Sequence, residues 1–273
     1  MRIALCNEVL RGEPFARQCE LAAALGYDGL EVAPFTLGEA PHLLSAAART
    51  ALRRTAAEAG LDLSGLHWLL AAPAGLSITD PGAAKRTRDV IERLIGLCAD
   101  LGGAYLVHGS PGQRRLPARD AAAARAHGAG MLAQAARAAE RSGLVYCLEP
   151  LAPPDADFVT SIAEAARIVR AIGSPALRTI IDTCAAGTSE SEPPAALIDR
   201  WMPTGLLAHM HLNDPNKRGP GQGAMRFGPV LAALRRHGYS GWIGVEPFDT
   251  VPDGPTSAAR AIGLLRGLLE DPA

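Results

Sequence analysis

The sequence predicts an α/β fold, a single (β/α)8 TIM barrel over residues 1–273, and three observations support this prediction. Eight short apolar runs recur along the chain, and each is followed by an Ala-, Leu- and Arg-rich stretch with helical periodicity. Unbroken alternation of strands and helices indicates a parallel sheet. An open doubly wound sheet more often carries a GxGxxG turn after its first strand, and CNEVLRGEPF at 6–15 contains no such turn.

The predicted strands are the apolar runs that contain β-branched residues. They lie at 2–8, 29–33, 63–69, 104–109, 144–149, 178–183, 206–213 and 242–246. The predicted helices lie at 14–25, 44–60, 81–101, 120–142, 161–172, 194–202, 227–237 and 256–270. Four helix ends carry a glycine where the helix must stop before the next strand, in ALGYDGL, AEAGLDL, RSGLVY and RRHGYSGW.

The composition is that of a globular protein, with 48% hydrophobic and 20% charged residues. A net charge of −1 gives no general attraction to nucleic acid, although it leaves a local basic groove open. No apolar run approaches the roughly 18–20 residues that a membrane span requires, and MRIALCNEVLRG lacks the features of a signal peptide. The five cysteines include no CxxC pair, which is typical of reduced thiols. We therefore expect a cytoplasmic protein without a nucleic-acid or membrane partner.

Polar and titratable side chains collect where the predicted strands end. In a barrel of this kind the active site lies at the C-terminal ends of the strands. The residues at those ends are Asn7, Glu8, Glu31, His67, His108, Glu149, Asp182, His211, Asp214 and Glu246. Their concentration at one mouth of the barrel predicts an active site there.

Four of these residues lie on four consecutive strands and have the chemistry of a metal site, namely Glu149, Asp182, His211 and Glu246. Three bare carboxylates held close together would repel one another. A divalent cation removes that repulsion, and three oxygens with one nitrogen suit Mn²⁺, Co²⁺ or Mg²⁺ better than a thiolate-rich zinc site does. Taken singly, each residue also has an ordinary structural explanation, as a loop start, a helix cap or a hydrogen-bonded core histidine.

Two further features leave alternatives open. His209 and His211 lie on the same face of their strand, either as paired core imidazoles or as part of an active-site wall. His67 and His108 either bind substrate or are hydrogen-bonded residues of the barrel. The segment VHGSPGQRR at 107–115 either binds substrate hydroxyls or a phosphate, or is a polar loop with solvated arginines.

Four motifs carry a family resemblance: LEPL at 148–151, IDT at 181–183, HMHLND at 209–214, and PGQGAMRFGPVLAALRRHGYSGWIGVEPF at 220–248. With these motifs the chain resembles the sugar isomerase/epimerase superfamily of xylose-isomerase-like TIM barrels, nearest its ketose 3-epimerase-type branch. The resemblance spans essentially the whole chain, and ALGYDGLEV at 24–32 fits the usual first helix and second strand of that family.

The resemblance implies a divalent metal held by Glu149, Asp182, His211 and Glu246, with the two glutamates as acid and base. It favours His211 over His209 as the ligand and leaves His209 one layer deeper in the barrel. Mn²⁺ is the expected ion, with Co²⁺, Mg²⁺ and Zn²⁺ as alternatives. The implied activity is isomerisation or epimerisation of a sugar or sugar phosphate through an enediolate. A small carbohydrate is the expected partner, and a homodimer is left open.

Three positions depart from the family's pattern. Ala185 stands where the 3-epimerases carry a substrate-binding histidine, and Lys217 replaces an arginine. Asp155 is the nearest counterpart of a glutamate that follows the first metal-binding Glu. The predicted substrate-binding residues are accordingly His67, His108, Lys217 and Asp155.

These departures leave the substrate and the reaction open. One alternative is a metal-dependent lyase or dehydratase acting on a keto-sugar or keto-inositol. Another is a multi-zinc apurinic endonuclease, which needs more metal-binding histidines and a basic face that a net charge of −1 disfavours. The last is a non-catalytic sugar-binding barrel, which would tolerate loss of Glu149 or Glu246.

Overall fold

Eight parallel strands close into a barrel in sequence order, with β8 hydrogen-bonded back to β1, which confirms the predicted fold. The computed structural model describes residues 1–270. The strands are β1 (Arg2–Cys6), β2 (Gly29–Val32), β3 (Asp62–Leu66), β4 (Tyr105–His108), β5 (Val145–Leu148), β6 (Leu177–Asp182), β7 (Leu207–Leu212) and β8 (Trp242–Val245). Residues 271–273 lie outside the described part, so a single domain over the whole of 1–273 stays a prediction.

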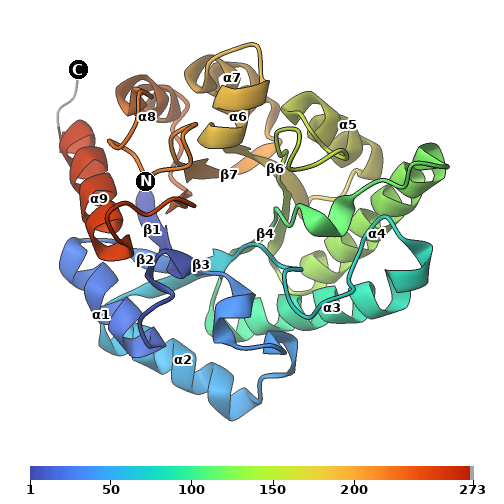
Figure 1. Ribbon diagram of the computed structural model, residues 1–273, viewed down its shortest axis with the longest axis horizontal. Coiled ribbons are helices and arrows are strands. Elements are labelled where there is room, and N and C mark those ends of the chain that lie inside the picture. Colours follow the sequence, from blue (N-terminus) through green and yellow to red (C-terminus); the bar gives the residue numbers. More distant parts are fainter. Residues whose placement is uncertain (271–273) are drawn as a thin grey trace.

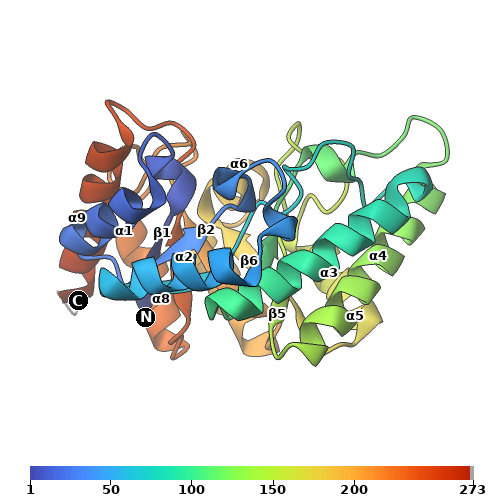
Figure 2. The ribbon, with the colours of Figure 1, turned by 90° about the horizontal axis from the view of Figure 1, so that it is seen from below.

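Helices surround the barrel as a ring (Figure 1). They are α1 (Phe15–Leu25), α2 (Ala46–Glu58), α3 (Ala84–Leu101), α4 (Ala121–Arg141), α5 (Ile162–Ile172), α6 (Thr183–Ser189), α7 (Pro194–Trp201), α8 (Phe227–Arg236) and α9 (Gly254–Glu270). The N-terminus lies at the opposite end of the barrel from α6, so α6 marks the mouth where the strands end (Figure 2). Within residues 1–270, no helix combines the length and the apolar character needed to cross a membrane.

The sequence did not predict α6. The segment TCAAGTS lacks an apolar helical period, which is typical of a connection. The helix forms because the carboxylate of Asp182, the last residue of β6, accepts a hydrogen bond from the Ala185 N–H at 2.5 Å. Two predicted strands are too long by more than one residue at their C-terminal ends: Asn7 and Glu8 belong to a 3₁₀ helix (Asn7–Leu10), and His67 follows Leu66, the last residue of β3.

The glycines expected at helix ends take the conformation that this role requires. Gly26, Gly60, Gly143 and Gly238 all have positive φ angles, between 63° and 92°. An L-residue with a side chain rarely adopts this left-handed conformation, so each glycine lets the chain leave a helix and turn toward the next strand. The four predicted helix ends are confirmed.

The interior of the barrel is filled by a small cluster made of Tyr105, Val107, Cys147 and Ile180. Cys147, two residues before Glu149, is fully buried in this cluster. A much larger apolar layer packs between the strands and the surrounding helices. Polar side chains are thereby left to the mouth above the inner cluster, where the strands end.

Candidate functional site

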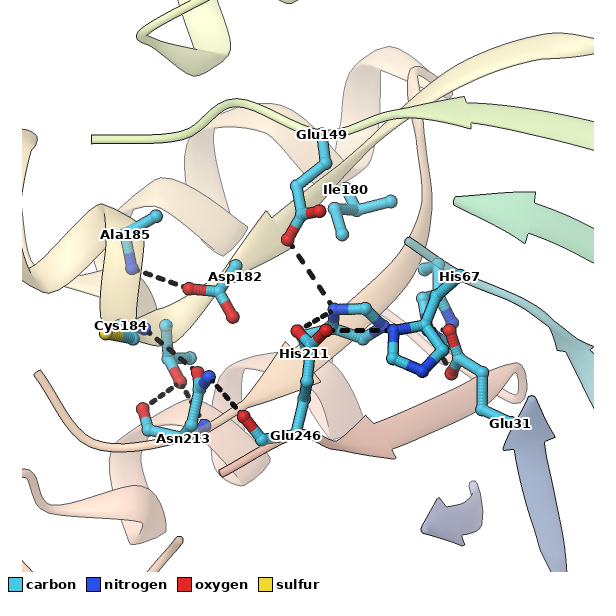
Figure 3. Close-up of polar contacts among 12 residues, drawn as sticks. Glu31, His67, Glu149, Ile180, Asp182, Cys184, Ala185, His211, Asn213 and Glu246 are labelled. Atoms are coloured by element: carbon cyan, nitrogen blue, oxygen red, sulfur yellow. Dashed lines mark hydrogen bonds and ion pairs between the residues drawn. The ribbon is translucent and has the colours of Figure 1, made fainter. Parts of the chain in front are cut away.

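The four residues predicted as metal ligands converge at the mouth of the barrel (Figure 3). Asp182 and His211 are direct neighbours across β6 and β7, while Glu149 and Glu246 follow the last residues of β5 and β8. One nitrogen or oxygen from each of the four lies within 4.8 Å of the others. Residues that are far apart in the sequence therefore form a compact group because four neighbouring strands end together.

The buried polar atoms at this point fit a cation. Among residues 1–270, Asp182 Oδ2, His211 Nδ1 and Glu246 Oε2 are buried and make no hydrogen bond. His211 Nδ1 lies 2.8 Å from Glu246 Oε2 and 3.6 Å from Glu149 Oε1. Buried polar atoms without partners cost free energy. A divalent ion bound by three carboxylate oxygens and one imidazole nitrogen would satisfy them, because such donors are typical ligands of divalent cations.

Burial and mutual repulsion also shift the pKa values of the three carboxyl groups in this site. Burial and repulsion from Glu149 and Glu246 raise the pKa of Asp182 well above its usual value. Burial also raises the pKa of Glu149. Burial acts on Glu246 in the same direction, but His211 and His67 outweigh it and lower the pKa of Glu246 to about 2. The carboxylates repel one another and need a positive charge between them, which a divalent ion supplies.

Glu31 orients the ligand histidine from inside the barrel. Its Oε1 lies 2.9 Å from His211 Nε2, and its Oε2 lies 3.0 Å from His209 Nε2. Tyr105 donates its O–H to Glu31 Oε2 at 2.7 Å. A carboxylate at Nε2 favours the tautomer with its proton there and leaves Nδ1 free to bind a cation. Burial alone would raise the pKa of Glu31, but His209 and His211 hold it well below its usual value.

These contacts answer the question that the two histidines of β7 raise. His211 directs Nδ1 toward the carboxylate group, whereas His209 bonds to Glu31 deeper in the barrel and stacks on Tyr105 with the ring centroids 4.1 Å apart. His209 is therefore a hydrogen-bonded core residue. The role of Glu31 was not predicted, although its position at a strand end was noted, because its partners come from β4 and β7.

His67 connects two carboxylates. Its Nδ1 lies 2.9 Å from Glu246 Oε1, and its Nε2 lies 3.0 Å from Glu8 Oε2. Although burial lowers it, the pKa of His67 is well above the ordinary value because of Glu8 and Glu246. His67 thus holds one oxygen of Glu246 and leaves the other directed toward His211. We call the four candidate ligands, Glu149, Asp182, His211 and Glu246, the metal group.

The loop at 107–115 was left open between a substrate-binding segment and a polar loop with solvated arginines, and Arg114 does not fit the second alternative. Arg114 is fully buried, and its Nη1 donates to the backbone oxygen of Glu149 at 2.6 Å. His108 is also buried and pairs through Nδ1 with the Tyr146 hydroxyl at 2.7 Å. Burial and the nearby Arg114 lower the pKa of His108 to about 3, so it is neutral. Arg114 supports the end of β5, and no sequence pattern distinguished it from its neighbour Arg115.

Asn213 ties α6 to the end of β8 (Figure 3). Its side-chain NH₂ donates to the backbone oxygen of Glu246 at 2.8 Å, and its side-chain oxygen accepts from the Cys184 N–H at 3.2 Å. The Asn213 N–H donates to the Thr183 hydroxyl at 3.0 Å. The backbone that carries Asp182 and the backbone that carries Glu246 are therefore held in a fixed relation.

A pocket of about 400 Å³ opens above the metal group. Glu149, Asp182 and Glu246 line its floor, and Lys217 and Asp155 line its wall with Nζ and Oδ2 3.5 Å apart. His67 and His108 lie behind the wall and are not among its lining residues. Metal binding by the four ligands and substrate contact by Lys217, Asp155, His67 and His108 stay predictions.

Comparison with known proteins identifies the family and the fold. A family model described as "Xylose isomerase-like TIM barrel" matches residues 19–268. D-psicose 3-epimerase of Enterocloster bolteae is 26% identical to this chain over 86% of the chain and 77% of that protein. The 2-epi-5-epi-valiolone 7-phosphate 2-epimerase of Actinoplanes sp. is 31% identical, over 81% of this chain and 77% of that protein.

The fold has close structural neighbours. A crystal structure of D-psicose 3-epimerase in the presence of D-fructose superimposes with a TM-score of 0.84, covering 99% of this chain and 100% of that chain. At 21% sequence identity, this likeness shows a shared fold.

Proposed function

Because this chain belongs to the xylose isomerase-like TIM barrel family, we propose that it is a divalent-metal-dependent sugar epimerase or isomerase. The observation that carries the proposal is the buried group of Glu149, Asp182, His211 and Glu246 at the floor of the pocket. The relatives with which it aligns over most of its length include a D-psicose 3-epimerase and a 2-epi-5-epi-valiolone 7-phosphate 2-epimerase. A small carbohydrate is the proposed partner.

The four ligands would hold the ion, for which Mn²⁺ is our first choice. When bound, a divalent ion would supply Lewis-acid chemistry that makes a C–H next to a substrate carbonyl more acidic. Glu31 keeps His211 in the tautomer that this binding requires. Asn213 and Arg114 hold the backbone of Glu246 and Glu149 in place.

Glu149 and Glu246 are the proposed acid and base. They arise from the ends of β5 and β8, so a substrate on the pocket floor would meet a carboxylate from each strand. His211 and His67 stabilise the ionised form of Glu246, so the proposed base is unprotonated when a substrate arrives. In epimerisation, Glu149 would return a proton from the other side. In isomerisation, one base would move the proton along one face.

A metal-dependent lyase or dehydratase is the second candidate. Ala185 lines the pocket where the 3-epimerases carry a substrate-binding histidine, so the wall offers space and no imidazole at that point. The same carboxylates that remove a proton beside a carbonyl could promote loss of a leaving group on the next carbon.

Metal content and proton exchange measured together test the proposal. We expect the purified protein to bind one divalent ion per chain and to exchange carbon-bound protons of a ketose with D₂O, as NMR of the sugar after chelation of the metal would show. Glu246→Gln should abolish the exchange because an amide cannot take the proton. Glu20→Gln, on the exposed face of α1, is the matched control and should exchange normally.

The labelled product separates the candidate reactions. Deuterium at an inverted carbon identifies epimerisation, transfer to the neighbouring carbon identifies isomerisation, and a dehydrated product identifies the lyase. Absence of stoichiometric metal would contradict the four-ligand assignment and reduce His211 to a core residue.

A further inference from the structure

Within residues 1–270, the pocket above the metal group has no site prepared for a phosphate, and we propose that its substrate is an uncharged keto-sugar rather than a sugar phosphate. This inference rests on the proposed function and resolves the phosphorylation state that the sequence left open. Lys217 is the only basic residue lining the pocket in the described chain. Its Nζ lies 3.5 Å from Asp155 Oδ2, so its charge is already balanced.

The charge of the pocket opposes an anion. Four carboxylates line it, from Glu149, Asp155, Asp182 and Glu246. A bound divalent ion and Lys217 together leave one negative charge uncompensated. A phosphate group carries nearly two negative charges at neutral pH and would be repelled.

The backbone donors that bind phosphate in many barrels are already used. Such sites commonly lie in the loops after the seventh and eighth strands, beside a helix N-terminus. After β8, the N–H groups of Phe248 and Asp249 both donate to the Lys217 carbonyl oxygen at 2.8 Å. In the first turn of α9, the Thr256 N–H donates to the Asp253 carboxylate at 2.7 Å. These donors bond within the protein and do not face the pocket unpaired.

In the loop after β7, backbone N–H groups are likewise already hydrogen-bonded within the protein. This loop contains the glycines of RGPGQG, a composition that suits anion binding, but it wraps around a carboxylate of this chain. Asp214, which is buried, accepts from the Asn216 N–H at 3.2 Å and from the Met225 N–H at 2.8 Å. Asp214 therefore takes the place in this loop that a phosphate would otherwise occupy.

The remaining walls of the pocket are apolar. Trp68, Leu151, Pro153, Pro215 and Phe248 contribute to them. A phosphate pressed against such side chains would lose its hydration without gaining partners, which costs free energy. The C–H faces of a sugar ring lose little water and pack well against aromatic and proline rings. The walls therefore favour an uncharged substrate.

Paired probes test this inference with the metal-loaded protein. We would measure proton exchange in D₂O and dissociation constants for D-fructose, D-psicose and D-tagatose, each beside its 6-phosphate. We expect exchange with at least one free ketose and at least tenfold weaker binding of the corresponding phosphate. Preferential exchange and binding of a 6-phosphate would overturn the inference while leaving the proposed function intact. Failure of both classes to bind or exchange would defeat the proposed function, and the inference with it.

A charge-balance variant gives a second and independent test. Asp155→Asn leaves Lys217 without its counter-ion, so the ratio of 6-phosphate affinity to free-ketose affinity should rise by about threefold, the effect expected of one partly exposed ion pair. Adding Lys217→Met to Asp155→Asn should reverse the gain. Asp199→Asn, at an exposed ion pair with Arg236, is the matched control. An unchanged ratio in Asp155→Asn would show that Asp155 does not balance the charge of Lys217 and would overturn the inference.

Discussion

At the scale of single residues, Glu31 determines how the candidate metal site is oriented. It contacts His211, His209 and Tyr105 at 2.7–3.0 Å, and it is fully buried. Its strand-end position was visible in the sequence, but its role depends on partners from β4 and β7. Glu31 does not line the pocket and contacts the candidate ligands through His211, which makes it a positioning residue.

Glu31→Gln should therefore weaken metal binding. The substitution keeps the size of the side chain but removes the charge that holds the proton on His211 Nε2, so affinity for Mn²⁺ should fall about 10- to 100-fold. Equilibrium dialysis measures the affinity, and ¹⁵N NMR of the His211 ring reports its tautomer. Glu20→Gln serves as control. Unaltered affinity together with an unaltered tautomer would rule out the positioning role.

At the scale of elements, β7 and β8 approach so closely at Gly244 that no side chain larger than the hydrogen of glycine fits there. A Cβ at Gly244 would lie 2.6 Å from Glu31 Oε2 and 2.7 Å from His211 Cδ2, both closer than real atoms approach. His211 and Gly244 are direct neighbours across these two strands. The glycine in WIGVE is thus required by the side chains beside it.

Gly244→Ala should displace both Glu31 and His211. We expect a loss of about 1–3 kcal/mol in the free energy of unfolding, as for other overpacked interiors, and weaker binding of Mn²⁺. Urea unfolding and equilibrium dialysis measure the two effects. Gly263→Ala in α9 is the matched control, since a Cβ there meets nothing within 4 Å and should stabilise the helix by about 0.5–1 kcal/mol. Equal stability of the two variants would contradict the crowding at Gly244.

At the scale of the whole molecule, the barrel brings three mutually repelling carboxylates together at the ends of β5, β6 and β8. Glu149, Asp182 and Glu246 are nearly fully buried, and repulsion from the other two helps raise the pKa of Asp182. Repulsion among these buried carboxylates therefore destabilises the fold unless a cation is bound. Metal binding and stability of the fold should be coupled.

Removal of the metal should accordingly lower the melting temperature. With free Mn²⁺ at 100 times its dissociation constant, binding stabilises the native state by about 2.7 kcal/mol, which for a chain of this size raises Tm by roughly 5–10 °C. Scanning calorimetry with Mn²⁺ and with EDTA tests this. Asp182→Asn combined with Glu246→Gln should abolish the difference between the two conditions. Identical melting of the native protein in both would count against a metal at this site.

The sequence by itself determined the barrel and the strand ends from which the candidate ligands come. Strands and helices follow from local periodicity, and glycine at helix ends acts on its own neighbours. The strand-end rule then placed Glu149, Asp182, His211 and Glu246 at one mouth without any knowledge of contacts. The family resemblance selected His211 over His209, and the structure supports that choice, since His209 bonds to Glu31.

Only the tertiary structure decided what surrounds those four residues. The sequence left open whether Arg114 is solvated or binds substrate, and it is buried against Glu149, while α6 begins because Asp182 caps it. The pairing of Lys217 with Asp155 and the role of Glu31 arise between segments that are distant in the chain. The physical reason is that hydrogen bonds and charge balance depend on distances of a few ångströms, which closure of the barrel sets and local sequence patterns do not encode.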